Sequence, residues 1–228
     1  MDTTLDHMSP RERAVYLTKS TGVLPAMKLK QKEDVVPWVR AMYDGGARVV
    51  EITMTSPGVL EHFEAIRAAF GDRLFIAAGT CLDGAAARDA ILAGARVIVS
   101  PAVVPEVIAT AHRYGAACFS GAFTATEVLT AMQLGAHMVK IFPAALGGPK
   151  YMTNLKMVFP EVSLVPSGGI SPENAGEFIK CGASAVSGAR NFFDRETVER
   201  EGAGWITRQV QIYMEIVARA REEAPPLP

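Results

Sequence analysis

The sequence has few cysteines, and none lies in a spacing that holds a metal ion. The 228 residues include 3 Cys, at positions 81, 118 and 181, so no two of them form a CxxC motif. A disulfide framework or a structural zinc site is therefore not expected. Few and scattered thiols are typical of a reducing compartment, and we predict a cytoplasmic protein.

Long apolar runs and a strong net charge are also missing. No apolar run approaches the roughly 18 residues that a membrane helix needs. The charged N-terminal segment lacks the apolar centre of a signal peptide. Lys and Arg number 23 against 24 Asp and Glu, a formal net charge of −1. Neither nucleic acid nor a membrane is an expected partner, although a local basic patch can still bind a phosphate.

The sequence does contain a repeated pattern in which a short apolar run is followed by a polar or Gly-rich turn and then an amphipathic stretch. The apolar runs predict strands at Val23–Met27, Arg48–Met54, Leu74–Ala78, Val97–Ser100, Ala117–Ser120, Met138–Pro143, Ser163–Pro166 and Ala185–Gly188. The amphipathic stretches predict helices at Glu33–Tyr43, Gly58–Phe70, Gly84–Leu92, Val104–Arg113, Thr126–Leu134, Tyr151–Val158 and Glu173–Lys180, with a last helix inside Gly202–Arg221.

Strands that alternate with helices predict an α/β protein with a parallel sheet, and eight such units suit a (β/α)8 TIM barrel. The alternative is a doubly wound open sheet, but no GxGxxG motif follows the first strand. We predict a single domain over residues 1–228, with an extra N-terminal helix inside 1–20 that begins near Ser9 and a frayed tail at 222–228.

Lys140 is the first candidate for chemistry because it interrupts an apolar strand. Val139 and Ile141 flank it, so strand alternation places them on the opposite face, toward the helices. Lys140 then points into the lumen, where burial disfavours the charged ammonium. A neutral amine is the species that attacks a ketone, and a desolvated lysine is an activated nucleophile. A lysine that snorkels or pairs with a carboxylate is the structural alternative.

Glu51 lies in a second predicted strand and shares its face with Thr53. A carboxylate inside a barrel needs a partner, and Lys140 is the obvious one. Such a pair can also transfer protons. A buried ion pair with no catalytic role is the alternative.

The turns after the strands carry the remaining candidates, because barrel active sites lie at the C-terminal ends of strands. Gly79 and Thr80 end the third strand. Gly79 lets a ligand approach the backbone closely, and Thr80 offers a hydroxyl. Ser167-Gly168-Gly169 follows the seventh strand and opens a helix, so its amides suit an anion. Gly188 and Arg190, after the eighth strand, are expected to complete this anion site.

The four histidines, at 7, 62, 112 and 137, form no HExxH motif or other metal-binding spacing. An iminium ion on a lysine already serves as an electron sink. We therefore expect no metal and no cofactor. Thr124 and Glu127 fit a capping box, which favours a structural role for both.

With these residues in place, the chain resembles the class I aldolases that act on 2-keto-3-deoxy-6-phosphogluconate and 4-hydroxy-2-oxoglutarate. The resemblance extends from about Val23 to Phe193. The matching segments, in order, are Val23-Leu24-Pro25, Gly45-Gly46-Ala47 with Glu51-Ile52-Thr53, Ala78-Gly79-Thr80, Ser100-Pro101, Gly121 with Thr124 and Glu127, Lys140-Ile141-Phe142-Pro143-Ala144 and Pro166-Ser167-Gly168-Gly169-Ile170-Ser171.

The resemblance implies a (β/α)8 barrel, usually a homotrimer, that cleaves a 4-hydroxy-2-keto acid to pyruvate and an aldehyde through a Schiff base without a metal. It implies that Lys140 forms the imine and that Glu51 is the general acid and base. The other roles that it implies concern the substrate: Thr80 and the backbone near Pro101 contact the pyruvate portion, Phe142 forms a packing wall, and Gly168, Gly169 and Gly188 hold the distal or phosphate end.

Two positions depart from the family pattern. Many members have an arginine four residues after the glutamate, where it contacts the substrate carboxylate, and here that position is Thr55. Relatives with a similar turn often carry Arg near the position of Lys28, so Lys28 is expected to replace the missing charge. At the last strand a family Gly-Gly-Ser becomes Ser187-Gly188-Ala189, and Arg190 is expected to compensate for the lost hydroxyl.

Two other functions fit the same residues. A phosphosugar isomerase or epimerase barrel would use Glu51 and Lys140 as an acid–base pair without covalent capture. A non-catalytic ligand-binding barrel would bind a keto acid with neither turnover nor imine, since one fold hosts many functions.

Overall fold

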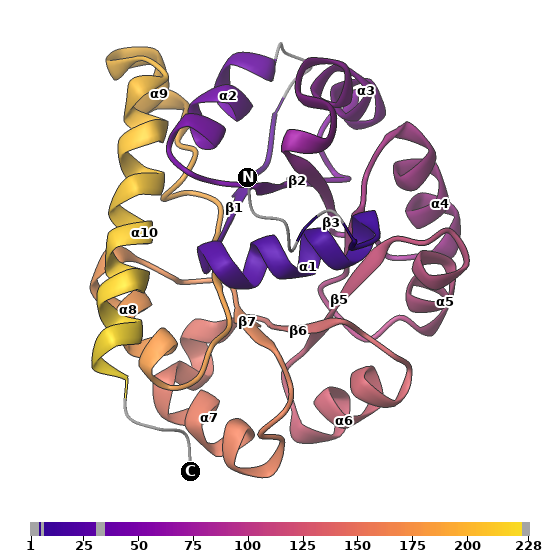
Figure 1. The fold of residues 1–228 in the computed structure, drawn as a ribbon, viewed down its shortest axis with the longest axis vertical. Helices are drawn as coiled ribbons and strands as arrows, with labels where there is room; N and C mark the ends of the chain where they lie inside the picture. The colour runs from indigo at the N-terminus through magenta and orange to yellow at the C-terminus, as the bar shows by residue number, and fades with distance from the viewer. Residues whose placement is uncertain (1–4, 6, 31–34, 225–228) are drawn as a thin grey trace.

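The computed structural model describes residues 5, 7–30 and 35–224, and its eight strands form one parallel sheet (Figure 1). The strand order is β7-β6-β5-β4-β3-β2-β1-β8. Neighbouring strands in the sheet are therefore consecutive in sequence, except for β1 and β8. The strands are β1 Val23–Met27, β2 Val49–Thr53, β3 Phe75–Gly79, β4 Val97–Val99, β5 Ala117–Ala122, β6 Met138–Ile141, β7 Leu164–Pro166 and β8 Val186–Gly188.

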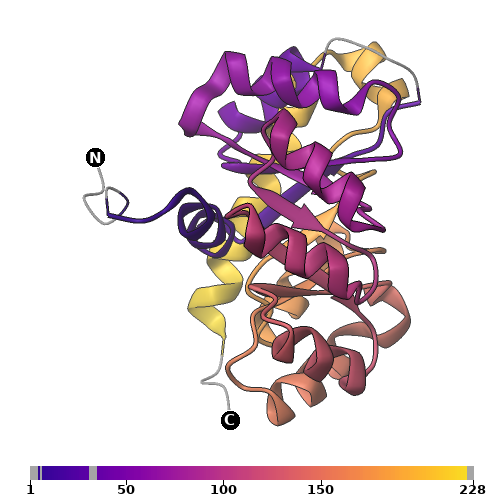
Figure 2. The same cartoon turned by 90° about the vertical axis from the view of Figure 1, so that its right-hand side faces the viewer.

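Helices alternate with the strands, and all of them except the first, α1, lie around the outside of the barrel (Figures 1 and 2). They are α1 Pro10–Thr21, α2 Val36–Asp44, α3 Val59–Phe70, α4 Gly84–Ala93, α5 Pro105–Arg113, α6 Ala125–Gln133, α7 Ala144–Val158, α8 Pro172–Lys180, α9 Arg195–Glu201 and α10 Gly204–Glu223, with a short 3₁₀ turn at Gly71–Arg73. The predicted capping box is confirmed at α6, where the Glu127 amide donates to the Thr124 hydroxyl at 3.3 Å and the Thr124 amide donates to the Glu127 carboxylate at 2.7 Å.

The predicted barrel is confirmed. β1 pairs with β8 as well as with β2, and the remaining gap between β7 and β8 is bridged by the parallel pairs Leu164–Ala183 and Ser167–Ser187. Closure removes the unpaired edges that an open sheet would expose. It also brings the C-terminal ends of all eight strands to one end of the barrel.

Two apolar cores lie on the two faces of the sheet. Val50, Ile52, Val139 and Ile141 belong to the larger core between the strands and the helices, as strand alternation predicted. A smaller core fills the lumen with one or two side chains from each of β1 to β7 and with Ala185, which directly precedes β8. Its strand residues are Leu24, Val49, Phe75, Ala77, Val97, Val99, Ala117, Phe119, Met138 and Val165. The lumen is therefore packed over its lower part and leaves room only near the C-terminal ends of the strands.

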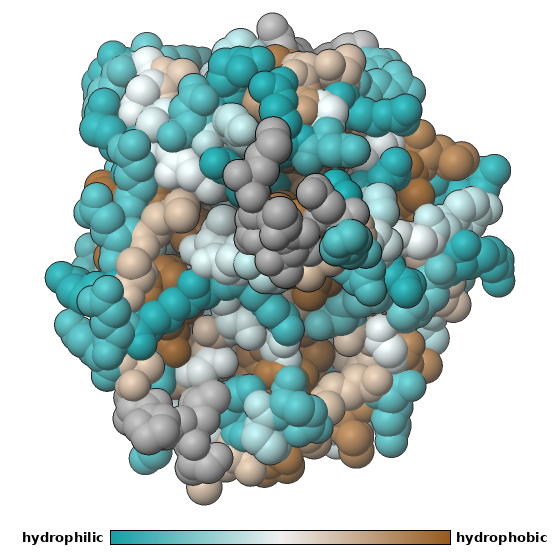
Figure 3. All heavy atoms as spheres, viewed as in Figure 1, coloured by the Kyte–Doolittle hydropathy of each residue, from teal (hydrophilic) through white to brown (hydrophobic). Residues whose placement is uncertain are grey.

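The extra helix α1 closes the N-terminal end of the lumen. Figure 1 shows α1 crossing the middle of the barrel, and Figure 2 shows it outside the strands on one side. Ala14 of α1 is fully buried in the lumen core, where Val15 and Leu17 also pack. The face that carries α1 is mostly hydrophilic (Figure 3). The N-terminal end of the barrel is therefore filled by apolar packing, and the C-terminal end of the strands is the end where an active site can form.

Three elements differ from the sequence prediction. Helix α9 was not predicted, because its seven residues, RETVERE, carry no apolar repeat and bury only Val198. Helix α7 begins at Ala144 rather than Tyr151, since two helical pieces meet at Gly148, whose φ of 67° and ψ of −177° are not helical. The predicted start of a helix at Glu33 lies outside the described residues, and the described helix α2 begins at Val36.

The C-terminal tail also begins later than predicted. Residues 222 and 223 form the end of α10, and Glu223 pairs with Lys180 of α8 at 2.9 Å. Residues 225–228 lie outside the described part. In the part of the chain that the structure describes, no helix combines the length and the apolar character needed to cross a membrane.

A histidine pair lies at the N-terminal end of β6. The Nδ1 atom of His137 accepts a hydrogen bond from the Cys118 amide at 3.1 Å, and its ring stacks on His112 at 5.2 Å between centroids. Burial, followed by the nearby His112 and Arg11, lowers the pKa of His137 below its usual 6.5. The folded protein therefore binds a proton here less readily than the unfolded chain does.

This lowered pKa predicts a pH-dependent stability. The contribution of His137 is fully present above pH 6.5, the unfolded value, and is lost as the pH falls toward the lower folded value. Urea unfolding between pH 5 and 8 should show a free energy of unfolding that falls below pH 6.5 in the parent protein, and less steeply in His137→Asn. The exposed His7→Asn is the control, and equal pH slopes in all three proteins would contradict the assignment.

Candidate active site

A buried lysine–glutamate pair joins opposite sides of the barrel. Lys140 lies on β6 and Glu51 on β2, four strands away in the sheet order. The Lys140 Nζ donates to Glu51 Oε1 at 3.0 Å and to Oε2 at 3.2 Å. Lys140 is 8% exposed and Glu51 is 2% exposed. Two charges this deep are tolerated because each neutralises the other and their hydrogen bonds are made.

The backbone of β3 makes room for the glutamate. A Cβ atom on Gly79 would lie 2.3 Å from Glu51 Oε1, which is far inside van der Waals contact. Only glycine leaves space for the carboxylate between β3 and Lys140. The next residue, Thr80, has a φ of 61°, a left-handed conformation that costs a β-branched residue free energy.

A cavity of about 490 Å³ opens above the pair at the C-terminal ends of the strands. This volume is within the usual range for a small-molecule site. The lining residues are Ala26, Glu51, Thr53, Lys140, Phe142, Ser167, Gly168, Gly169, Ile170, Ser171, Gly188, Ala189, Arg190 and Asn191. This lining brings together most of the predicted site residues, namely Glu51, Thr53, Lys140, Phe142, Ser167, Gly168, Gly169, Gly188 and Arg190.

The other predicted site residues lie outside this lining. Gly79 is the last residue of β3, and Thr80 and Pro101 follow β3 and β4 at the same end of the barrel. Gly79 acts by leaving space for Glu51. The Thr55 hydroxyl is 3.1 Å from that of Thr53. Lys28 lines a neighbouring cavity, in which Arg190 also takes part.

Two turns after β7 and β8 form the distal wall of the cavity. Within the described residues, the amides of Gly169 and Ile170 donate to no protein acceptor, whereas the parallel Ser167–Ser187 bridge directs the Gly168 amide toward the Ser187 carbonyl. Gly168 and Gly169 both have positive φ, near 84° and 82°. A run of free amides at the start of a helix, here α8, is suited to bind an anion.

Two asparagine side chains hold this turn. The Asn174 amide donates to the Gly169 carbonyl at 2.9 Å, and the Asn191 amide donates to the Ile170 carbonyl at 2.6 Å. Asn191 also donates to the Tyr213 hydroxyl of α10 at 3.1 Å, and burial raises the pKa of Tyr213 to about 12. Because the carbonyls of Gly169 and Ile170 accept these hydrogen bonds, the backbone amides of the same turn keep their orientation.

Sequence analysis did not assign Asn191 or Ala26 to the site. Ala26 had a detectable signal, because it pairs in register with Glu51 and shares the lumen side of β1 with Leu24. Asn191 had no detectable signal in the sequence, since it lies in a turn beyond β8. Its role in the site is visible only from its hydrogen bond to the carbonyl of Ile170, twenty-one residues earlier.

Other reactive groups near the barrel core are unsuited to nucleophilic chemistry. Burial raises the pKa of both Cys81 and Cys118 to about 12, so both remain thiols at neutral pH. Among the described residues, no three His, Cys, Asp or Glu side chains converge as a metal-binding group. The expectation that no metal is needed stays a prediction.

An eight-stranded barrel with a buried lysine at the C-terminal ends of its strands defines a TIM-barrel enzyme. The model of the family described as "KDPG and KHG aldolase" matches residues 16–209. The chain belongs to this aldolase family and is an aldehyde-lyase.

Named relatives agree with this assignment. The chain is 36% identical over 170 residues to the 2-dehydro-3-deoxy-6-phosphogalactonate aldolase of Escherichia coli K12, a match that covers 74% of this chain and 83% of the relative. It is 38% identical over 158 residues to the 2-dehydro-3-deoxy-phosphogluconate aldolase of Treponema pallidum, which covers 69% and 75% of the two chains.

A solved structure of a KDPG aldolase from Legionella pneumophila, with pyruvate captured as a covalent carbinolamine, has a similar fold. The TM-score is 0.80 at 27% identity, and the match covers 90% of this chain and 97% of the other. The fold and the family assignment therefore agree.

The tight space around Glu51 predicts the effect of Gly79→Ala. The added methyl must displace the carboxylate from Lys140, and overpacking of this kind costs about 1–3 kcal/mol. Chemical denaturation should show that loss of stability. Gly176→Ala in α8 is the control, because its Cβ would lie at an ordinary 3.5 Å from Ile216. Unchanged stability in Gly79→Ala would mean that Glu51 has room to move.

Proposed function

We propose that the protein is a Schiff-base aldolase that cleaves a 4-hydroxy-2-keto acid to pyruvate and an aldehyde, with Lys140 as the nucleophile and Glu51 as the general acid and base. The observation that carries this proposal is the hydrogen-bonded contact of the two side chains at the base of the cavity. A lysine amine in contact with a proton acceptor is the arrangement that covalent capture of a ketone requires.

Capture begins with proton transfer from Lys140 to Glu51, which leaves a neutral amine. The amine attacks the C2 carbonyl of the keto acid, and a proton moves to the carbonyl oxygen to give a carbinolamine. Glu51 protonates the C2 hydroxyl, water leaves, and an iminium ion remains.

Cleavage uses the iminium ion as the electron sink. The C3–C4 bond breaks, its electron pair moves toward the nitrogen, and Glu51 accepts the proton of the C4 hydroxyl as the aldehyde forms. The remaining enamine takes a proton at C3. Water then hydrolyses the iminium to release pyruvate and regenerate the Lys140 amine.

The remaining residues are proposed to hold the substrate. Thr80 and the backbone at Pro101 contact the pyruvate portion and Phe142 forms a wall beside Lys140. Thr53 and Thr55 lie near Glu51, and Lys28 supplies positive charge for a carboxylate. The turn of Ser167, Gly168 and Gly169, with Gly188 and Arg190, holds the distal end.

The relatives support two kinds of substrate for this site. Both named relatives are aldolases of phosphorylated six-carbon keto acids, and the family also includes aldolases of KHG. The free amides near Gly168 favour a substrate with an anionic distal group, such as 2-keto-3-deoxy-6-phosphogluconate or 4-hydroxy-2-oxoglutarate. We also propose a cytoplasmic homotrimer; one structural neighbour, a designed cage, was built by fusing symmetric oligomeric domains.

Replacement of Lys140 tests the nucleophile. Incubation with pyruvate and borohydride, followed by intact mass and peptide mapping, should show a reduced adduct on Lys140 in the parent protein and none in Lys140→Ala. Lys140→Arg is a second variant, because it retains the positive charge beside Glu51 but cannot form the imine. Lys150→Ala, at an exposed lysine of α7, should label normally.

An adduct that persists on another lysine in Lys140→Arg would show that the assignment is wrong. A folded parent protein that shows no adduct would favour the isomerase or the binding-protein function instead, because neither needs covalent capture.

The hydrogen bonds of Asn191 predict a selective effect on the distal end of the substrate. Asn191→Leu frees the Ile170 carbonyl, so the neighbouring amides lose their orientation. Because a hydrogen bond to a charged group contributes about 1.5–3 kcal/mol, the KM for a phosphorylated keto acid should rise roughly tenfold or more. Pyruvate labelling by borohydride should be unchanged, since pyruvate has no distal group. A purely structural role would lower stability without this rise in KM.

A further inference from the structure

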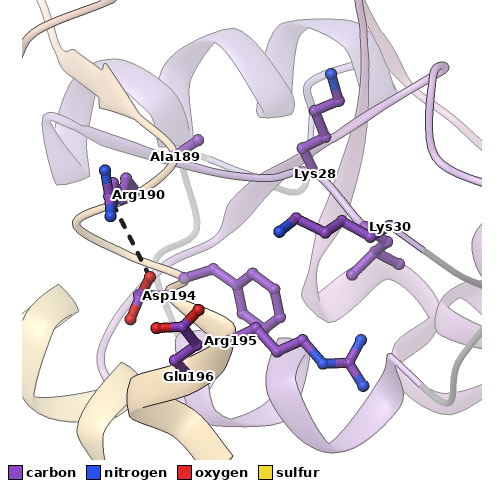
Figure 4. Close-up of a pocket in the computed structure, with 9 residues that line it drawn as sticks. Lys28, Lys30, Ala189, Arg190, Asp194, Arg195 and Glu196 are labelled. Atoms are coloured by element: carbon purple, nitrogen blue, oxygen red, sulfur yellow. Dashed lines mark ion pairs between the residues drawn. The ribbon is translucent and has the colours of Figure 1, made fainter.

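A second cavity has a volume of about 520 Å³ and is shown in Figure 4. The segment after β1 forms one side, and the segment from β8 into α9 forms the other. The two cavities share Ala189 and Arg190. The full lining is Lys28, Leu29, Lys30, Ala189, Arg190, Phe193, Asp194, Arg195 and Glu196.

Positive charge dominates this second cavity. Its lining has four basic and two acidic side chains, a formal excess of two positive charges. The carboxylate of Asp194 is already engaged, because it accepts from the Thr197 amide at 3.1 Å and from the Thr197 hydroxyl at 2.6 Å. Its contact with Arg190 is long, at 4.0 Å, and the Arg190 side chain is 89% exposed.

Two lysines add positive charge to this cavity. Within the described residues, neither Lys28 nor Lys30 has an ion-pair partner. Figure 4 shows Lys30 directed toward the segment that carries Ala189 and Arg190, whereas Lys28 extends away from it. An isolated surface lysine would be fully solvated and need no ligand, but cations around a concave surface with low-dielectric walls concentrate a positive potential.

Apolar side chains form part of the wall. Leu29 is 3% exposed and Phe193 is 8% exposed, and the Phe193 ring packs on Trp38 at 4.9 Å between centroids. These contacts hold the wall in place. A preformed cavity with an apolar wall and a few charged groups is the usual character of a small-molecule site.

We propose that this second cavity binds a small organic anion, a phosphomonoester or a carboxylate, with the anionic group between Lys30 and Arg190 and the organic portion against Phe193 and Leu29. The site does not depend on the proposed imine chemistry. Two sources have this chemistry: the far end of a long substrate held on Lys140, or an independent anionic metabolite. In either case Arg190 connects the two cavities.

Isothermal titration calorimetry at low ionic strength tests this proposal, with phenyl phosphate and inorganic phosphate as probes. Phenyl phosphate should bind more tightly than phosphate, because its ring adds apolar contact. Lys30→Met should weaken phenyl phosphate binding roughly three- to tenfold, and Lys30→Arg should restore it. Lys19→Met removes the same charge from α1 at the opposite end of the barrel and should bind as the parent protein does.

Inhibition kinetics separate the two sources. If the cavity holds the far end of the substrate, phenyl phosphate should raise the KM for a phosphorylated keto acid in the parent protein and less so in Lys30→Met. If the ligand is independent, phenyl phosphate should bind without raising that KM. Pyruvate labelling by borohydride should be normal in Lys30→Met, which would show an intact reaction cavity. Equal affinity for phenyl phosphate in the parent protein and Lys30→Met would overturn the proposal, whatever the outcome of pyruvate labelling.

Discussion

The ion pair between Lys140 and Glu51 is the interaction on which the site depends. Each group is costly inside a barrel by itself, and removing one partner of such a pair typically costs about 3–5 kcal/mol because the other charge stays buried. The pair spans the lumen from β6 to β2, so it requires a closed barrel. It also explains why Gly79 of β3 has no side chain. The charged pair that makes the site reactive therefore limits which residues fit on three strands, β2, β3 and β6.

The remainder of the barrel is arranged so that this pair lies at the base of an open cavity. Helix α1 and the apolar lumen core fill the opposite end, and the helices outside hold the strands in place. The turns after β7 and β8 are linked to each other and to α10 through Asn191. Arg190, between two cavities, connects the reaction site to a second basic surface. The strands thus carry the reactive pair, and the turns after them form the walls of the cavity.

Local pattern predicted those parts of the protein that strand alternation governs. The sequence pattern predicted β1 and, on β6, the helix-facing side chains of Val139 and Ile141 and the lumen position of Lys140. All residues of β1 and β6 are buried, so the signal was the apolar run itself and the alternation of side chains between the two faces of the sheet. Helix α9 left no such signal, since its residues are almost all polar. The start of α7 was missed because Gly147, Gly148 and Pro149 indicate a break, and the structure instead joins two helical pieces at Gly148.

The barrel, the family resemblance and the two residues that carry charge into the lumen could be predicted from the sequence, since these depend on local periodicity and on residue type at strand ends. Which turns share a cavity became visible only in the folded chain. The tertiary structure placed Lys28 in the second cavity rather than in the cavity that contains Lys140, and it revealed Asn191 as a link between turns. These relations arise from barrel closure, which brings β1 beside β8, and no local pattern records a contact between residues more than 150 positions apart.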